Sequence, residues 1–229
     1  LIFFLGASVG SFLYLAAMLT VAGESLLRPG SHCDHCHTPL GAAELVPILS
    51  YVALQGRCKT CHAAIGIAST LTELLSGFLF VLFYLRLGLN ASFVLYCTIV
   101  SILLLMAGID LATQDVYDRH LILVGVLVFL LLVWEKKAVI SALPGVFVWI
   151  LFAFAAKDRM GDGDKILIGL LLFLFAPPLQ LRFFLYSVWA AAGVAIFLLI
   201  HGADKKRPIP FVPFIAIGFT LVILFHGGV

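Results

Sequence analysis

The sequence predicts an all-α membrane protein with about eight transmembrane helices and a small polar domain between the first and second helices. Of its 229 residues, 63% are hydrophobic and 11% are charged, whereas soluble domains have about 45–50% apolar and about 25% charged residues. Several apolar stretches reach the roughly 20 residues needed to cross a hydrocarbon core of about 30 Å. These stretches are continuous rather than alternating, which favours helices over a membrane barrel.

The apolar stretches give the expected helices in order. They lie near 1–22, 69–86, 90–109, 120–134, 138–156, 166–176, 183–201 and 209–227. We interpret the first as a retained helix because no cationic segment precedes it, as would be expected of a signal peptide. The breaks between helices carry turn signals such as Pro177-Pro178 and the segment from Lys205 to Pro210.

The distribution of cations predicts the orientation. If the N-terminus is outside, ten of the 14 cations fall on the inside. They are Arg28, Arg57, Lys59, Arg119, Lys157, Arg159, Lys165, Lys205, Lys206 and Arg207, against Arg86, Lys136, Lys137 and Arg182 outside. Cytoplasmic loops carry an excess of Lys and Arg, so we expect both termini on the outer side of the membrane and membrane lipid around the helices. The net charge of +2 gives no reason to expect a nucleic-acid partner.

The expected organisation has three parts: a first helix at 1–22, a cytoplasmic domain at 23–68 and a membrane domain at 69–229. The middle part is polar and contains four of the five cysteines. A domain this small usually needs a metal or a disulfide to be stable.

The four cysteines form two C-x-x-C pairs, Cys33/Cys36 and Cys58/Cys61. Two such pairs provide four thiolates for a tetrahedral zinc ion, so we expect a structural zinc site. Two disulfides are an alternative, although thiols stay reduced in the cytoplasm. Another is a mixed site in which a neighbouring histidine replaces a cysteine. The neighbouring histidines are His32, His35, His37 and His62.

A histidine follows each cysteine pair, so both also read as C-x-x-C-H, the pattern of haem c attachment. The alternative function is therefore a membrane-anchored c-type cytochrome. The expected cytoplasmic position of the cysteines argues against it, because haem c is attached outside the cytoplasm.

Two aspartates at the expected cytoplasmic membrane edge are the candidate catalytic residues. Asp110 ends an apolar stretch, and Asp164 ends the string Gly161-Asp162-Gly163-Asp164. An ionisable residue at membrane depth is a functional candidate by default. Two adjacent carboxyl groups would share a proton and activate a water, as in aspartic peptidases. The glycines would let the backbone turn tightly and approach a substrate chain closely.

The acids also have simpler interpretations. Asp164 is a suitable helix N-cap, and a transporter or scaffold could use the aspartates as a proton relay or as caps. Glu73, inside an apolar stretch, is either a functional acid or the partner of a cation. We expect Asp115, Asp118 and Asp162 to be neighbours of the site rather than catalysts.

Seven motifs in this order resemble the type IV prepilin peptidases, which are GxGD aspartic membrane peptidases. The motifs are Gly10 to Leu13, Ser31 to Leu40, Leu45 to Ser50, Gly56 to Cys61, Thr72 to Leu75, Asp110 to Asp118 with Gly161 to Asp164, and Pro210 to Phe214. The short polar domain and the tail from Lys205 to Phe214 look most like competence-type members.

The resemblance implies a prepilin leader peptidase and N-methyltransferase. Asp110 and Asp164 would be the catalytic pair, and Cys33, Cys36, Cys58 and Cys61 would bind zinc. The substrate would be a type IV prepilin or pseudopilin, cut at the cytoplasmic membrane face. The new N-terminus would then be methylated with S-adenosylmethionine; no residue is assigned to that step.

Overall fold

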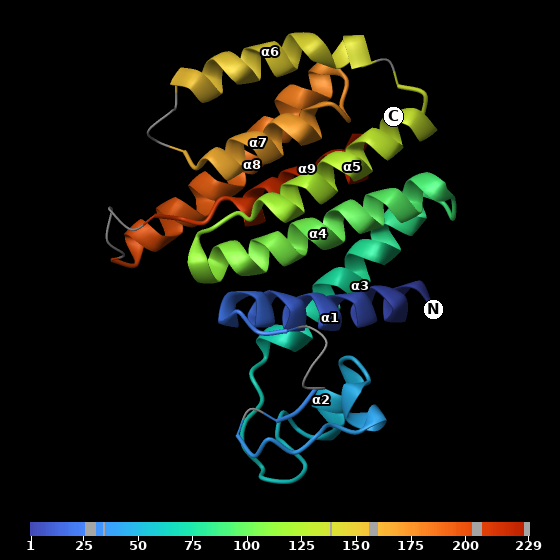
Figure 1. The fold of residues 1–229 in the computed structure, drawn as a ribbon, viewed down its shortest axis with the longest axis vertical. Coiled ribbons are helices and arrows are strands. Elements are labelled where there is room, and N and C mark those ends of the chain that lie inside the picture. The colour runs from blue at the N-terminus through green and yellow to red at the C-terminus, as the bar shows by residue number, and fades with distance from the viewer. Residues whose placement is uncertain (26–30, 34, 138, 156–159, 203–207, 227–229) are drawn as a thin grey trace. The chain divides into compact units, whose positions relative to one another are not determined.

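The computed structural model describes residues 1–25, 31–33, 35–137, 139–155, 160–202 and 208–226 (Figure 1). In these residues the chain is helical, and strand pairing is limited to two isolated bridges in the polar segment. The all-α prediction is therefore confirmed. Part of the charge pattern used for orientation lies outside the described residues, namely Arg28, Lys157, Arg159, Lys205, Lys206 and Arg207, as do Asp34 and Asp204.

Each of the eight expected apolar helices is present. In chain order the elements are α1 Ile2–Ala22, η1 Ala42–Leu45, α2 Leu49–Ala53, α3 Ala68–Leu87, α4 Ala91–Thr113, α5 Asp118–Trp134, α6 Val139–Ala155, α7 Asp162–Leu172, α8 Pro177–Ile200 and α9 Val212–His226. In the described part of the chain, α1, α3, α4 and α8 are long and apolar enough to cross a membrane, while α6 and α9 contain shorter apolar stretches. The protein is a multi-pass membrane protein.

Two helix starts differ most from the sequence prediction. Helix α7 begins at Asp162 rather than near 166, so Asp164 lies in its first turn. Helix α8 begins at Pro177 rather than near 183, and the two prolines occupy its first positions. A proline is tolerated there because the first N–H groups of a helix have no intrahelical partner. Pro177-Pro178 therefore starts a helix, whereas the sequence suggested only a break.

The chain divides into two compact units, Leu1–Tyr84 and Leu85–Val229. In the first, α1 packs closely on α3 at two glycines. A side chain on Gly6 would lie 2.7 Å from the Ser76 carbonyl oxygen, and one on Gly10 would lie 2.7 Å from that of Thr72. Membrane helices approach closely where one presents small residues, which explains the need for Gly10 in the first-helix motif.

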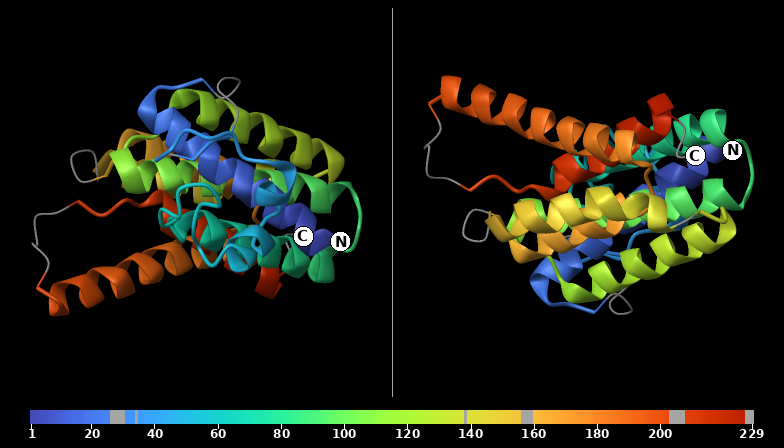
Figure 2. Two further views of the ribbon diagram at one scale, coloured as in Figure 1. Left: turned by 90° about the horizontal axis from the view of Figure 1, so that it is seen from below. Right: turned by 90° about the horizontal axis from the view of Figure 1, so that it is seen from above.

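In the second unit, α4 packs against α5 and α9, and α7 packs against α5, α6 and α9. Rings of Phe175, Phe183 and Phe219 meet in the core between these helices. The first half of α8 packs on α9, and its second half diverges from α6 and α7 (Figure 2). This packing brings the end of α4 and the start of α7 to the same region of the unit.

Candidate functional site

The four cysteines of the polar segment converge on one point. Their sulfurs all lie within 4.8 Å of one another. Cys33 and Cys61 are 3.8 Å apart, and Cys36 and Cys58 are 4.0 Å apart. A tetrahedral zinc ion with Zn–S bonds of about 2.3 Å holds its sulfurs about 3.8 Å apart. The spacing therefore fits a single zinc ion bound by four thiolates.

Local backbone structure produces this convergence. In each pair the residue after the second cysteine turns into the left-handed region, His37 with φ 54° and His62 with φ 56°. The His37 N–H donates to the Cys33 carbonyl, and the His62 N–H donates to the Cys58 carbonyl. The histidines thus complete two matching turns.

The environment of Cys36 also suits a metal ligand. Cys36 Sγ and Thr38 Oγ1 form a hydrogen bond of 3.3 Å. This bond is the main reason that the pKa of Cys36 is lowered to about 6. A thiolate, the form that binds zinc, is then present at neutral pH. All five cysteines in the described chain are free thiols, so the disulfide interpretation finds no support. Four sulfurs gathered at one point also suit one ion better than two separate haem attachments.

Glu73 is buried in α3, 6% exposed, and both of its oxygens accept hydrogen bonds. The Ile48 N–H donates to Oε2 at 2.8 Å, and Ser69 Oγ donates to Oε1 at 3.2 Å. Ile48 has φ 64°, an unfavourable conformation for a β-branched residue. The carboxylate therefore holds a strained turn of the polar segment against α3.

Asp110 lies in the last turns of α4 and is 4% exposed. Its Oδ2 accepts a hydrogen bond of 2.9 Å from the Val212 N–H, the first residue of α9. The first N–H groups of a helix lack intrahelical partners and favour a negative charge nearby. The motif Pro210 to Phe214 thus supplies a donor for the first aspartate, a contact between residues 102 apart that the sequence did not reveal.

Asp164 comes from the first turn of α7, before the apolar stretch that starts at Ile166. Its Oδ1 is buried and has no hydrogen-bond partner among the described residues. Burial, and secondarily the nearby Asp110 carboxylate, raise the pKa of Asp164 to about 6. Asp164 is therefore the member of the pair better suited to hold a proton.

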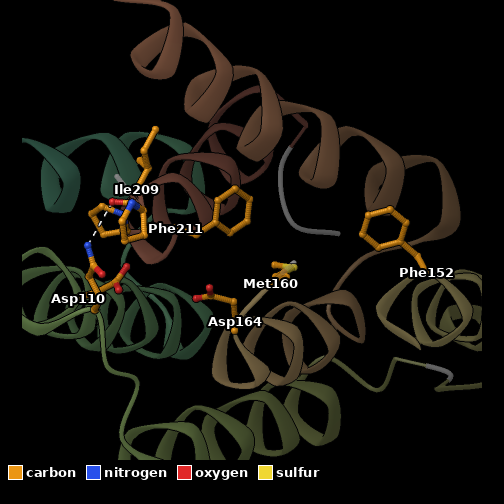
Figure 3. Close-up of a pocket in the computed structure, with 10 residues that line it drawn as sticks. Asp110, Phe152, Met160, Asp164, Ile209 and Phe211 are labelled. Atoms are coloured by element: carbon orange, nitrogen blue, oxygen red, sulfur yellow. Dashed lines mark hydrogen bonds between the residues drawn. The ribbon is translucent and has the colours of Figure 1, made fainter. Parts of the chain in front are cut away.

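The two aspartates face the same pocket, which has a volume of about 690 Å³. Figure 3 shows the Asp164 carboxyl group directed across the open space towards Asp110, with Ile209 and Phe211 on one wall and Met160 and Phe152 at the other side. The remaining lining residues are Gln114, Gly161, Pro208 and Pro210. The pocket that the two carboxyl groups line is therefore large enough for a water and a segment of peptide chain.

The glycines of the G-x-G-D string lie at the start of α7, and Gly161 lines the pocket. Gly161 is the N-cap of α7 with φ −57°, and Gly163 lies within the helix. A side chain on Gly163 would lie 2.5 Å from Val116 Cβ. Gly163 thus permits close packing of the protein on itself, and neither glycine uses a left-handed turn.

Three other acids lie away from the pocket. Asp115 and Asp118 are exposed, and the Asp162 side chain is 91% exposed and pairs with Lys165 at 2.9 Å. None of the three lines the pocket in the described structure. Sequence reasoning gave no pocket role to Gln114 or to the segment Pro208–Phe211, although the motifs Asp110 to Asp118 and Pro210 to Phe214 overlap them. The Gln114 amide donates to the Pro208 carbonyl at 3.1 Å, a long-range contact without a local signal.

Comparison with known proteins places the chain in a family. The family model described as "Bacterial Peptidase A24 N-terminal domain" matches residues 4–87. The chain is 33% identical to a prepilin leader peptidase/N-methyltransferase of Aeromonas hydrophila, over 90% of this chain and 74% of that protein. The chain belongs to the prepilin leader peptidase/N-methyltransferase family.

Other members of the prepilin leader peptidase/N-methyltransferase family agree over most of the chain. A relative from Bacillus subtilis is 28% identical over 100% of this chain and 95% of its own length. One from Burkholderia pseudomallei (strain K96243) is 34% identical over 89% of this chain and 70% of its own. No solved structure matches the chain. The resemblance found in the motifs is thus confirmed by whole-chain similarity.

Proposed function

We propose that this protein is an aspartic prepilin peptidase that uses Asp110 and Asp164 to remove the leader peptide of type IV prepilins or pseudopilins. The observation that carries the proposal is the pocket that both aspartates line, with the Asp164 carboxyl group directed towards Asp110 (Figure 3). The names of the relatives supply the substrate class. The transporter interpretation has weaker support, because the acids lie at helix ends rather than along a path through the bundle.

In the proposed reaction the two carboxyl groups have different roles. The Val212 N–H stabilises the ionised form of Asp110, which acts as the base towards a water held between the aspartates. Asp164 holds the proton and donates it towards the carbonyl oxygen of the scissile peptide bond. Cleavage should therefore weaken as the pH rises through the raised pKa of Asp164, because the ionised carboxylate has no proton to donate.

The expected zinc ion would be bound by Cys33, Cys36, Cys58 and Cys61. It would supply folding energy to the small cytoplasmic domain at 23–68 rather than take part in hydrolysis. We further propose that 1–22 is the first membrane helix and 69–229 the peptidase domain. The cation distribution supports an active site at the cytoplasmic face, and the short polar domain and the tail from Lys205 to Phe214 support a competence-type member of the family.

A second activity, N-methylation with S-adenosylmethionine, is proposed from the names of the relatives alone. Glu73 remains a candidate functional acid for either activity. Its two hydrogen bonds to Ile48 and Ser69 support instead a role in holding the polar segment to α3.

The test uses purified enzyme in lipid nanodiscs with a prepilin substrate. We expect Asp110→Asn and Asp164→Asn each to lower the rate of leader removal at least on the order of 1,000-fold, because each removes one partner of the acid–base pair. Asp162→Asn is the matched control, since it makes the same change two residues away on an exposed side chain, and it should cleave normally. Normal cleavage by either variant of the pair would refute the proposal.

A further inference from the structure

The helix that carries Asp164 is too short to cross a membrane. Helix α7 has 11 residues, which corresponds to about 16 Å, roughly half of a hydrocarbon core of about 30 Å. The last three carbonyls of α7 accept from the N–H groups three residues further on, which closes the helix with a tightened turn. The carbonyls just beyond this turn precede Pro177-Pro178, which has no N–H to offer, and lipid provides no water to satisfy them. These carbonyls therefore need partners from elsewhere in the protein.

Lys137, between α5 and α6, provides one of these partners. Its Nζ donates to the Leu174 carbonyl, just beyond α7, at 2.9 Å. The same ammonium group pairs with Glu135 at 2.8 Å and donates to the Tyr96 hydroxyl at 3.4 Å. Tyr96 in turn donates to Glu135 Oε2 at 3.3 Å. The Lys137 and Glu135 side chains are only 20% and 12% exposed, so water screens this network little.

The network joins the two helices that carry the aspartates. Tyr96 is a fully buried residue of α4, and it lies 14 positions, or about 21 Å, along the helix from Asp110. Leu174 lies a comparable number of residues beyond Asp164. Lys137 therefore connects the far ends of α4 and α7, while the near ends present the aspartates to the pocket.

Gln180 of α8 provides a second connection. Its Nε2 donates to the Leu172 carbonyl, the last residue of α7, at 3.0 Å and to the Ala142 carbonyl of α6 at 3.1 Å. The side chain is 4% exposed. Both hydrogens of the Gln180 amide therefore take part in hydrogen bonds, and the end of α7 is connected through Gln180 to α8 and α6.

We propose that Lys137 and Gln180 are positioning residues for leader cleavage, which set the depth of α7 and so hold Asp164 opposite Asp110. The inference rests on the proposed function of the aspartate pair. A packed helix moves along its axis as a unit, so a shift at its far end is passed to Asp164. A misplacement of about 1 Å at a catalytic group can cost on the order of 100-fold in rate.

The test compares Lys137→Met and Gln180→Met, which keep side-chain length but remove the donors, with Lys136→Met. Lys136 is the adjacent exposed lysine, so its variant makes the same charge change without touching α7. For Lys137→Met and Gln180→Met we expect kcat per folded enzyme to fall on the order of 10- to 100-fold. KM should stay constant, because neither residue lines the pocket.

The pH profile separates positioning from mere stabilisation. The Asp110 charge contributes to the raised pKa of Asp164, and a wider separation weakens that contribution. The alkaline limb of the activity profile should therefore move to lower pH in Lys137→Met. Lys137→Arg keeps a cationic donor and should recover most of kcat and the original profile.

Two results would overturn the inference. One is an unchanged kcat in both Met variants. The other is a loss that follows only the amount of folded enzyme, measured by thermal unfolding, with the pH profile unmoved. Either result leaves the aspartate pair intact, because the proposed function fails only if Asp110→Asn or Asp164→Asn still cleaves.

Discussion

Asp162 and Asp164 are two residues apart and have opposite environments. The Asp162 carboxylate is exposed and pairs with Lys165, whereas Asp164 Oδ1 is buried in the pocket without a partner among the described residues. Side chains two positions apart on a helix point in different directions. The residue at which α7 begins therefore decides whether the Asp162 or the Asp164 side chain is directed towards Asp110. Because α7 starts at Asp162, the fourth residue of the G-x-G-D string is the one that faces inward.

At this scale we predict the titration of Asp164. The protonated carboxyl band in infrared difference spectra should titrate near pH 6, because burial raises the pKa of Asp164 to about 6. The band should vanish in Asp164→Asn and titrate at lower pH in Asp110→Asn, which removes the neighbouring charge. It should be unchanged in Asp162→Asn. A wild-type enzyme without a carboxyl group titrating above its usual range would contradict this assignment.

At the scale of elements, α7 packs closely against the segment after α4. Gly163 faces Val116, whose Cβ would lie 2.5 Å from an added side chain. Gly169, in the same helix, would meet only Trp149 at 3.6 Å, an ordinary contact. The start of α7 is therefore more tightly constrained than its middle.

We predict that Gly163→Ala displaces the start of α7, at a cost of about 1–3 kcal/mol in stability. Leader cleavage should fall on the order of tenfold or more, since Asp164 is the next residue. Gly169→Ala serves as the matched control and should retain both activity and stability. Thermal unfolding and cleavage rates of the two variants measure the difference, and equal behaviour would show that the Val116 contact does not constrain the site.

At the scale of the whole molecule, the two kinds of chemistry belong to different compact units. The cysteine cluster lies in Leu1–Tyr84, and the aspartate pocket lies in Leu85–Val229. The family model that matches residues 4–87 covers the first unit. Metal binding and hydrolysis are therefore expected to be separable by mutation.

We predict about one zinc ion per chain, lost on substitution of Cys36 by Ser. Loss of zinc should expose residues 31–67 to proteases, because metal binding supplies folding energy to a small domain. Acidification should also release zinc, since protons compete for the thiolates. Cys97→Ser, which removes a buried thiol of α4 outside the cluster, should keep full zinc content by elemental analysis. Equal zinc loss in both variants would contradict the four-cysteine site.

Composition and short spacings along the chain were enough to predict the helical membrane class, the eight apolar helices and the two cysteine pairs. Where α7 and α8 begin, what Gly163 packs against and which groups contact Asp110 became visible only in the folded chain. The tertiary structure also showed that Glu135 belongs to a shielded network with Lys137 and Tyr96. Such contacts join residues 39 to 102 positions apart, and only the packing of helices against one another brings them together.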